Sequence, residues 1–432
     1  MEKFFKLSEN GTNVKTEIIG GITTFFAMAY IIFVNPDLLS ATGMDFQSVM
    51  VATCIASALG CFLTGLIANV PFAQAPGMGL NAFFSFTVAG AMGYTWQQGL
   101  TIVLISGLLF LVITVSPLRK AIIASIPADL KNAISTGIGL FIAFIGLNNA
   151  GIIKIFEGLT DMGDITHGAG LLAVIGILIT GVLMAWNVKG AIFIGIVATT
   201  IIGLPLGVTK IPESLVVVPH INTIFQFDFG GLMSLGVLPL ITAIITFLIV
   251  DMFDTVGTLI GTASNAGMID DEGNMKNGDK ALIADAIATC AGACLGTSTV
   301  TTYVESTTGV SAGARTGLSS CVTGVLFIIA LVLAPVAGIV PSAATAPAMI
   351  IVGVLMMKGV SKIDWNDIET AIPCFLTVAM MPFAYSIADG IGFGFISYAV
   401  IKLFRKKGRE VPVLIYVLSA LFIATYILTF LY

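Results

Sequence analysis

The sequence predicts an all-α, multi-pass protein of the cell (inner or plasma) membrane with about fourteen transmembrane segments. Of its 432 residues 57% are hydrophobic and 10% are charged, and the mean hydropathy is +1.04. A soluble domain is about a quarter charged. Apolar runs of spanning length recur along the whole chain, and no polar stretch between them is long enough for a soluble domain.

Seven predicted segments precede the polar stretch at 210–228, and seven follow it. In order they are 18–36, 47–69, 71–92, 97–116, 128–150, 168–187, 190–207, 235–265, 280–297, 299–315, 316–340, 366–386, 388–404 and 412–431. Equal halves indicate two repeats, 1–225 and 226–432. Because seven is odd, the second repeat enters the membrane in the opposite sense, which is a layout common in secondary transporters.

The first segment is expected to be retained, because the N-terminal residues lack the apolar stretch and cleavage site of a signal peptide. Loop charge favours a cytoplasmic N-terminus, with Lys3, Lys6, Lys15, Arg119, Lys120, Lys131 and Lys189 on one side and Glu157, Asp161 and Asp164 on the other. The basic stretch "KLFRKKGRE" (402–410) does not fit this charge distribution, because the count of fourteen segments places it on the extracytoplasmic side of the membrane. Either 388–404 is not a plain span, or "APAMIIVGVLMM" (346–357) also crosses.

Two segments have a composition that a continuous helix does not tolerate. The third, "PFAQAPGMGLNAFF" (71–84), holds two prolines and several glycines, and the tenth contains the β-branched run "TSTVTTY" (297–303). Each predicts a short extended piece followed by a half-helix that begins near mid-membrane. The two pieces could pair as antiparallel strands, and the half-helix N-termini would point free N–H groups at one buried spot.

Three carboxylates lie inside apolar segments. Asp251 and Asp254 are three residues apart, so they share a helix face, and Glu305 follows the extended run of the tenth segment. A charge at the bilayer centre costs about 2.5–3.5 kcal/mol, and such residues usually belong to ion or substrate pathways. The alternative is a structural polar network. Asp285 and Asp389 stand near predicted segment ends and are predicted to be structural.

Several other functions are excluded by what the sequence contains. The six cysteines are predicted to be buried, and no histidine near Cys290 and Cys294 completes a metal site. The two histidines, His167 and His220, fall at loop edges, so any proton relay depends on carboxylates. A net charge of −5 argues against a nucleic-acid partner, and the chain has no ATP-binding P-loop. We expect no cofactor, no metal and no enzymatic activity.

Three motifs together resemble those of the AzgA-like adenine/guanine/hypoxanthine permeases, in the nucleobase–cation symporter-2 (xanthine/uracil permease) family. They are "QAPGMGLNAFF" (74–84), "DMFDTVGTLIG" (251–261) and "YVESTTGVSAGARTG" (303–317). The resemblance implies fourteen segments in two inverted repeats. Segments 1–4 and 8–11 would form a core domain and segments 5–7 and 12–14 a gate domain, with the nucleobase bound between the third and tenth segments. It also fits a homodimer formed through the gate domain.

The same resemblance assigns residues to the site. Asp251 takes the place of the eighth-segment carboxylate that contacts substrate, and Glu305, preceded by Tyr303, takes that of the glutamate that bonds the base edge. Asn81 and Asp254 match polar positions of the AzgA-like branch. The uracil branch has a histidine where this chain has Thr255, which favours purines.

The sequence therefore predicts a proton-coupled importer of adenine, guanine or hypoxanthine. Asp251, Asp254 and Glu305 are the candidates for proton coupling. The aromatic rings that could stack on the purine are those of Phe26, Tyr30, Phe72 and Tyr303. Sodium coupling stays open, because carboxylate and hydroxyl oxygens serve either cation.

Four other functions are alternatives to this importer. A xanthine or uracil carrier of the same fold stays open, whereas an anion carrier is disfavoured because Glu305 would repel its cargo. An intramembrane aspartyl protease would need its two aspartates on different helices, and Asp251 and Asp254 share one. A channel would not give saturable, concentrative uptake.

Overall fold

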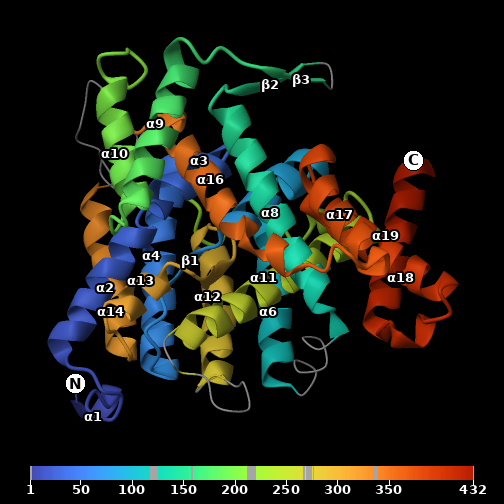
Figure 1. Cartoon of the computed structure of the whole chain (residues 1–432), viewed down its shortest axis with the longest axis horizontal. Coiled ribbons are helices and arrows are strands. Elements are labelled where there is room, and N and C mark those ends of the chain that lie inside the picture. The colour runs from blue at the N-terminus through green and yellow to red at the C-terminus, as the bar shows by residue number, and fades with distance from the viewer. Residues whose placement is uncertain are drawn as a thin grey trace.

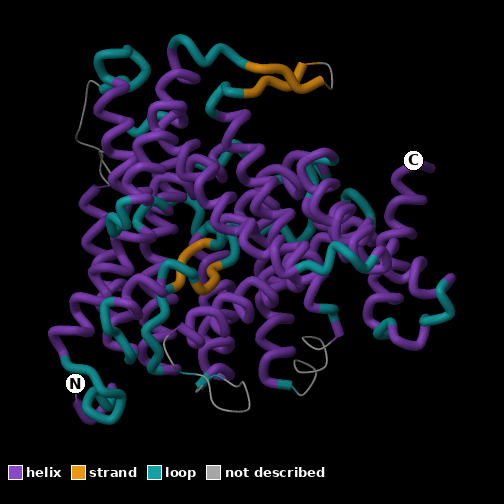
Figure 2. Tube along the Cα trace, in the orientation of Figure 1, coloured by secondary structure: helices purple, strands orange, loops and turns teal. Residues whose placement is uncertain are grey.

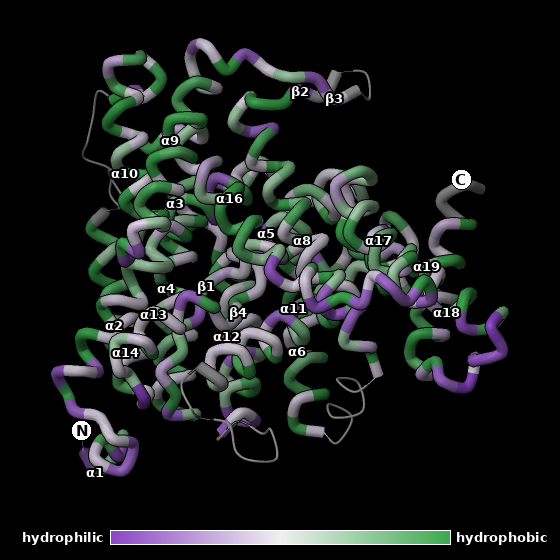
Figure 3. The backbone as a smooth tube through the Cα atoms, viewed as in Figure 1, coloured by the Kyte–Doolittle hydropathy of each residue, from purple (hydrophilic) through white to green (hydrophobic). Residues whose placement is uncertain are grey.

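The computed structural model describes residues 2–116, 125–156, 159–211, 220–265, 268, 275, 277–333 and 339–431, and it is mostly helical (Figures 1 and 2). Within these residues, eight helical stretches are long and apolar enough to cross a membrane, and five shorter apolar helices accompany them. Hydrophobic residues follow the helices, and the more hydrophilic residues gather at the N-terminal end and the loops (Figure 3). The all-α membrane class predicted from composition is confirmed.

The first half of the chain holds nine α-helices, two π-helical segments and three strands among its described residues. They are α1 (Glu2–Phe5), α2 (Val14–Met28), α3 (Ile31–Ser40), α4 (Phe46–Leu63), η1 (Thr64–Ala68), β1 (Gln74–Pro76), α5 (Met78–Ala82), η2 (Phe83–Ala91), α6 (Trp96–Val115), α8 (Ala128–Asn149), β2 (Ile153–Phe156), β3 (Leu159–Met162), α9 (Gly168–Ala185) and α10 (Ala191–Gly203). Side-chain caps begin several of them: Asn13 accepts from the Thr16 amide, and Thr95 forms a capping box with Gln98.

The described residues of the second half form one more strand and a further set of helices. They are η3 (Gly231–Met233), α11 (Val237–Asn265), α12 (Gly278–Leu295), β4 (Val300–Thr302), α13 (Ser306–Ser311), α14 (Gly317–Ala330), η4 (Leu331–Leu333), α16 (Ser342–Met356), η5 (Met357–Lys362), α17 (Ile368–Phe383), α18 (Ile387–Phe404), η6 (Gly408–Glu410) and α19 (Val413–Leu431). The helix α16 has no counterpart in the fourteen predicted segments.

Hydrogen bonds at both ends of α16 show that it crosses the bundle. At its first turn the hydroxyls of Ser342 and Thr345 each donate to the Asp37 carboxylate, at 2.8 Å, near the last turn of α3. Beyond its other end, the Asp364 amide donates to Asp129 Oδ1, at 3.1 Å, in the first turn of α8. Residues 342–362 form one of the eight stretches that are long and apolar enough to cross a membrane, as the second of the two alternatives for the C-terminal segments expects.

This extra crossing moves the basic stretch 402–410 to the side where α8 begins. Glu369, in the first turn of α17, is buried and accepts from Lys402, Arg405 and Lys407 at 2.9–3.0 Å. The N-terminal end and this loop both lie toward the lower part of the view in Figure 1. Gathering the basic residues on one face favours a cytoplasmic position for that face. Arg119, Lys120 and Glu157, used in the sequence argument, lie outside the described residues.

Near the centre of the molecule β1 pairs with β4, although 223 residues separate the end of one from the start of the other (Figure 2). The pair is antiparallel, with Gln74 opposite Thr302 and Pro76 opposite Val300, and all six residues are buried. The short helices α5 and α13 follow the two strands. The predicted extended pieces and half-helices of the third and tenth segments are confirmed, and the pairing satisfies backbone groups that a membrane interior would leave without water.

A glycine contact packs α14 against the start of η1, and it gives a test of the packing. A Cβ added to Gly317 would overlap the backbone oxygen of Gly65, so neither helix could keep its place. We expect Gly317→Ala to destabilise the protein by about 1–3 kcal/mol, as overpacking does, and to lower the unfolding temperature of the detergent-purified protein.

Gly181 in α9 is the matched control for this change, because a Cβ there meets nothing within 4 Å. Gly181→Ala is expected to leave the unfolding temperature unchanged or slightly higher, since alanine favours helix. Equal unfolding temperatures for Gly317→Ala and Gly181→Ala would contradict the close packing.

Candidate functional site

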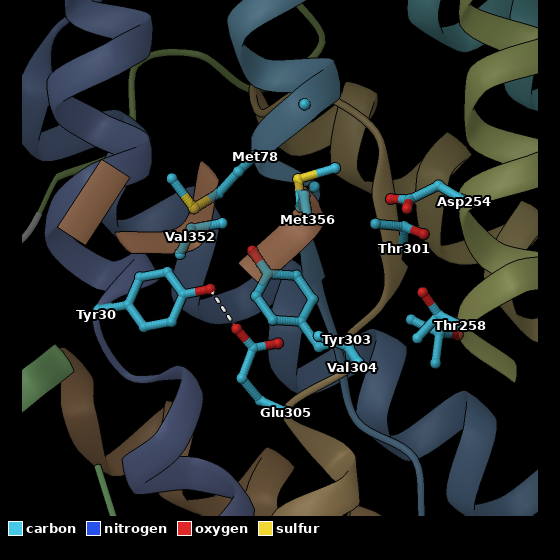
Figure 4. Close-up of a pocket in the computed structure, with 13 residues that line it drawn as sticks. Tyr30, Met78, Asp254, Thr258, Thr301, Tyr303, Val304, Glu305, Val352 and Met356 are labelled. Atoms are coloured by element: carbon cyan, nitrogen blue, oxygen red, sulfur yellow. Dashed lines mark hydrogen bonds between the residues drawn. The ribbon is translucent and has the colours of Figure 1, made fainter. Parts of the chain in front are cut away.

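A pocket lies where β4, the starts of α5 and α13, and the longer helices α11 and α16 come together beside Tyr30 (Figure 4). Thirteen residues line it: Tyr30, Gly77, Met78, Gly79, Asp254, Thr258, Thr301, Thr302, Tyr303, Val304, Glu305, Val352 and Met356. The predicted backbone-built spot is therefore a cavity, bordered by β4 and by the first turn of α5.

Two helices give the pocket one polar wall and one apolar wall. Asp254 and Thr258 of α11 are four residues apart and so project from one face of the helix. Val352 and Met356 of α16 have the same spacing and line the pocket with apolar atoms. A flat ligand with a polar edge would meet both kinds of surface.

Glu305, at the start of α13, is the carboxylate best defined by its contacts. The Tyr30 hydroxyl donates to its Oε1 at 2.6 Å, and its other oxygen points away from Tyr30 (Figure 4). Tyr303, two residues earlier, donates its hydroxyl to the Pro76 carbonyl at 2.5 Å across the strand pair. The rings of Tyr30 and Tyr303 lie 6.5 Å apart between centroids, with 41° between their planes. Among the described residues, no other side chain donates to the second Glu305 oxygen, which lies beside two fixed aromatic rings.

Behind the strand pair, Asp285 of α12 forms a second carboxylate centre. It is fully buried and accepts from Gln74 Nε2 at 3.0 Å, Thr302 Oγ1 at 3.2 Å and Thr255 Oγ1 at 2.9 Å. One side chain therefore ties β1, β4 and α11 to α12. The sequence predicts Asp285 to be a structural residue near a segment end. It lies within α12, and its carboxylate accepts from both strands.

Asp251 belongs to this second centre rather than to the pocket lining. Its Oδ2 accepts from Thr289 Oγ1 of α12 at 3.2 Å, while its buried Oδ1 has no hydrogen-bond partner among the described residues. Thr289 also donates to the Val300 carbonyl of β4, at 2.9 Å. The two aspartates of one predicted helix face are thus divided, since Asp254 borders the pocket and Asp251 faces α12.

The structure brings three of the six sequence-predicted site residues to the pocket: Asp254, Tyr303 and Glu305. Asp251, Asn81 and Phe72 are buried but are not among the residues that line it. Asn81 donates to the Pro76 carbonyl at 3.4 Å, and Phe72 packs in a separate apolar cluster with Phe110 and Met252.

Sequence reasoning missed three contributions to this site. Tyr30 was considered only as a stacking ring, because nothing in a sequence links it to a glutamate 275 residues away. Val352 and Met356 were missed because α16 was not among the predicted segments. The apolar run "APAMIIVGVLMM" indicates α16. The run is shorter than a typical membrane span and contains Pro347, so the sequence did not predict a helix there.

Comparisons with known proteins agree with this architecture. The family model for xanthine/uracil permeases, described as "Permease family", matches residues 15–393. The chain is 44% identical to the guanine/hypoxanthine permease PbuG of Bacillus subtilis, over 99% of each chain. It is 42% identical to the adenine permease AdeP of Escherichia coli, over 98% of this chain and 95% of the relative.

Among solved structures, the fold is similar to the transmembrane domain of the cyanobacterial bicarbonate transporter BicA, with a TM-score of 0.64 at 16% identity, covering 88% of this chain and 97% of that one. The likeness shows a shared transporter fold. The family match extends over most of the chain and the identity over nearly all of it. The chain belongs to the permease family of xanthine/uracil permeases, and it is a multi-pass membrane transporter rather than an enzyme.

Proposed function

We propose that this transporter imports purine nucleobases by proton symport, with adenine, guanine and hypoxanthine as candidate cargo. The observation that carries the proposal is the pocket with Asp254 and Glu305 on its lining beside Tyr303 and Tyr30. A purine is a flat ring with N–H donors on its edge, which carboxylate oxygens accept. Aromatic rings pack against flat apolar surfaces. Relatives named as adenine and guanine/hypoxanthine permeases support this cargo class.

Proton coupling is supported by the lack of a salt bridge at the buried carboxylates in the described part of the chain. Among the described residues, ion pairs lie near loops and helix ends, and none involves Asp251, Asp254, Asp285 or Glu305. An ionised carboxylate buried without a cation is costly. A proton that enters with the cargo would neutralise one of these carboxylates and remove that cost. Binding of the proton would then favour binding of the cargo, and the reverse.

The size of the expected gradient follows from the membrane potential. One inward charge gains about 2.3 kcal/mol per 100 mV. Since each 1.4 kcal/mol is tenfold, this would accumulate neutral cargo roughly fifty-fold.

We also propose the finer architecture of two inverted seven-segment repeats, 1–225 and 226–432. Supporting it, a strand followed by a short helix is the third segment of each half, and the two strands pair antiparallel. The described residues of the second half hold eight helical segments, because α16 adds one to the seven predicted. We count α16, α17 and α18 as segments 12–14 and leave α19 outside the seven segments. The core and gate domains would then be segments 1–4 with 8–11 and segments 5–7 with 12–14, and a homodimer would form through the gate domain.

The experiment that tests the function is uptake of labelled hypoxanthine, adenine and guanine into cells that lack their own purine carriers. We expect saturable, concentrative uptake of at least one purine, which collapses when a protonophore dissipates the proton gradient. Uptake that persists in the presence of the protonophore but requires sodium would mean that sodium, and not the proton, is the coupling ion. If no purine is taken up under any gradient, the cargo assignment is wrong, and xanthine, uracil and bicarbonate become the next cargo to assay.

A further inference from the structure

Tyr30 occupies an unusual place between two helices. The helix α2 ends at Met28 and α3 begins at Ile31, so Tyr30 lies in the break between them. Its side chain is only 1% exposed, and the Tyr303 ring lies beside it. A buried phenol held in this way has little freedom to turn its hydroxyl elsewhere, and hydrogen bonds to ionised groups are the strong ones.

The hydroxyl of Tyr30 determines which Glu305 oxygen is available. It donates to Oε1 at 2.6 Å, and the second oxygen points away from Tyr30 (Figure 4). The other tyrosine of the pocket, Tyr303, gives its hydroxyl to the Pro76 carbonyl. Both tyrosine hydroxyls therefore donate within the protein. Within the described residues the second Glu305 oxygen accepts from no other side chain, so the cargo meets an acceptor oxygen whose orientation is fixed.

We propose that Tyr30 is a positioning residue for the cargo, which acts through Glu305. By holding Oε1 it fixes the carboxylate so that the second oxygen accepts an N–H from the nucleobase edge. The inference rests on the proposed function, since it assumes that a purine occupies the pocket. Tyr30 acts on the cargo through the side chain of Glu305. Its loss therefore weakens binding of the cargo and leaves the maximal transport rate unchanged.

The test is the uptake kinetics of Tyr30→Phe, which removes the hydroxyl and keeps the ring. We expect the KM for the transported purine to rise about tenfold or more, because a hydrogen bond to a charged group is lost, while Vmax at equal surface expression stays within twofold. Tyr416→Phe is the control, since its hydroxyl donates to the Gly408 carbonyl in the 404–412 loop, away from the pocket. That variant should match the wild type.

A second variant separates positioning from a merely structural role. Glu305→Asp shortens the side chain and withdraws the carboxylate from the Tyr30 hydroxyl. If Tyr30 acts through Glu305, adding Tyr30→Phe to Glu305→Asp weakens binding of labelled purine by less than twofold further.

Two results would overturn the inference. One is an unchanged KM in Tyr30→Phe, or a fall in Vmax alone. The other is a full tenfold loss that persists in the Glu305→Asp background. If the wild type takes up purine and either result is found, only the role of Tyr30 is contradicted. An absence of purine uptake in the wild type contradicts the proposed function itself.

Discussion

Glu305→Gln is expected to reduce purine binding by about a hundredfold or more. The amide keeps the size of the side chain, so the fold should persist. It removes the charge that accepts from Tyr30 and from the cargo. Hydrogen bonds to charged groups contribute about 1.5–3 kcal/mol each, and losing about 2.7 kcal/mol is a hundredfold change in affinity.

Binding of labelled purine to the purified variant measures this loss, and surface expression and unfolding temperature report on folding. Glu9→Gln is the matched control, because Glu9 is exposed and its ion pair among the described residues is with Lys6, at the N-terminal end. A well-folded Glu305→Gln protein that binds purine as tightly as the wild type would remove Glu305 from the site.

The second large effect distinguishes the two aspartates of α11. Asp254 lines the pocket, so Asp254→Asn should weaken purine binding about tenfold or more, since it removes a charged acceptor. Asp251 contacts Thr289 behind the strands and not the pocket. Asp251→Asn should therefore bind purine within a few-fold of the wild type and lose concentrative uptake, if its carboxyl group takes part in proton coupling.

Parallel measurements of equilibrium binding and of uptake against a proton gradient separate these outcomes. Each variant is the control for the other, because the residue types and the helix are the same. The reverse pattern, with binding lost in Asp251→Asn and retained in Asp254→Asn, would place the cargo on the α12 side of α11.

The strand pair and the half-helices could be predicted because their signals are local. Prolines and glycines in 71–84 and β-branched residues in 297–303 exclude continuous helix over a few residues, wherever the rest of the chain lies. The carboxylates could be found for an energetic reason, since Asp251, Asp254 and Glu305 are costly in an apolar segment unless they have a function or a partner.

The orientation of α11 could not be predicted from the sequence. Residues three apart on a helix differ in direction by about 60°, so Asp251 and Asp254 share a face but can touch different neighbours. Which one borders the pocket depends on how the helix is rotated against α12 and the strands. The roles of Asp285 and Tyr30 could not be predicted either, because their partners Gln74 and Glu305 are 211 and 275 residues away in the sequence.

The most direct test of this account is an experimental structure of the protein with a transported purine bound. The account predicts density for the base in the pocket between α11 and α16, with a base N–H within hydrogen-bond distance of the Glu305 oxygen that Tyr30 leaves free, and a second polar edge at Asp254. A purine bound elsewhere in the bundle, with this pocket empty, would contradict it.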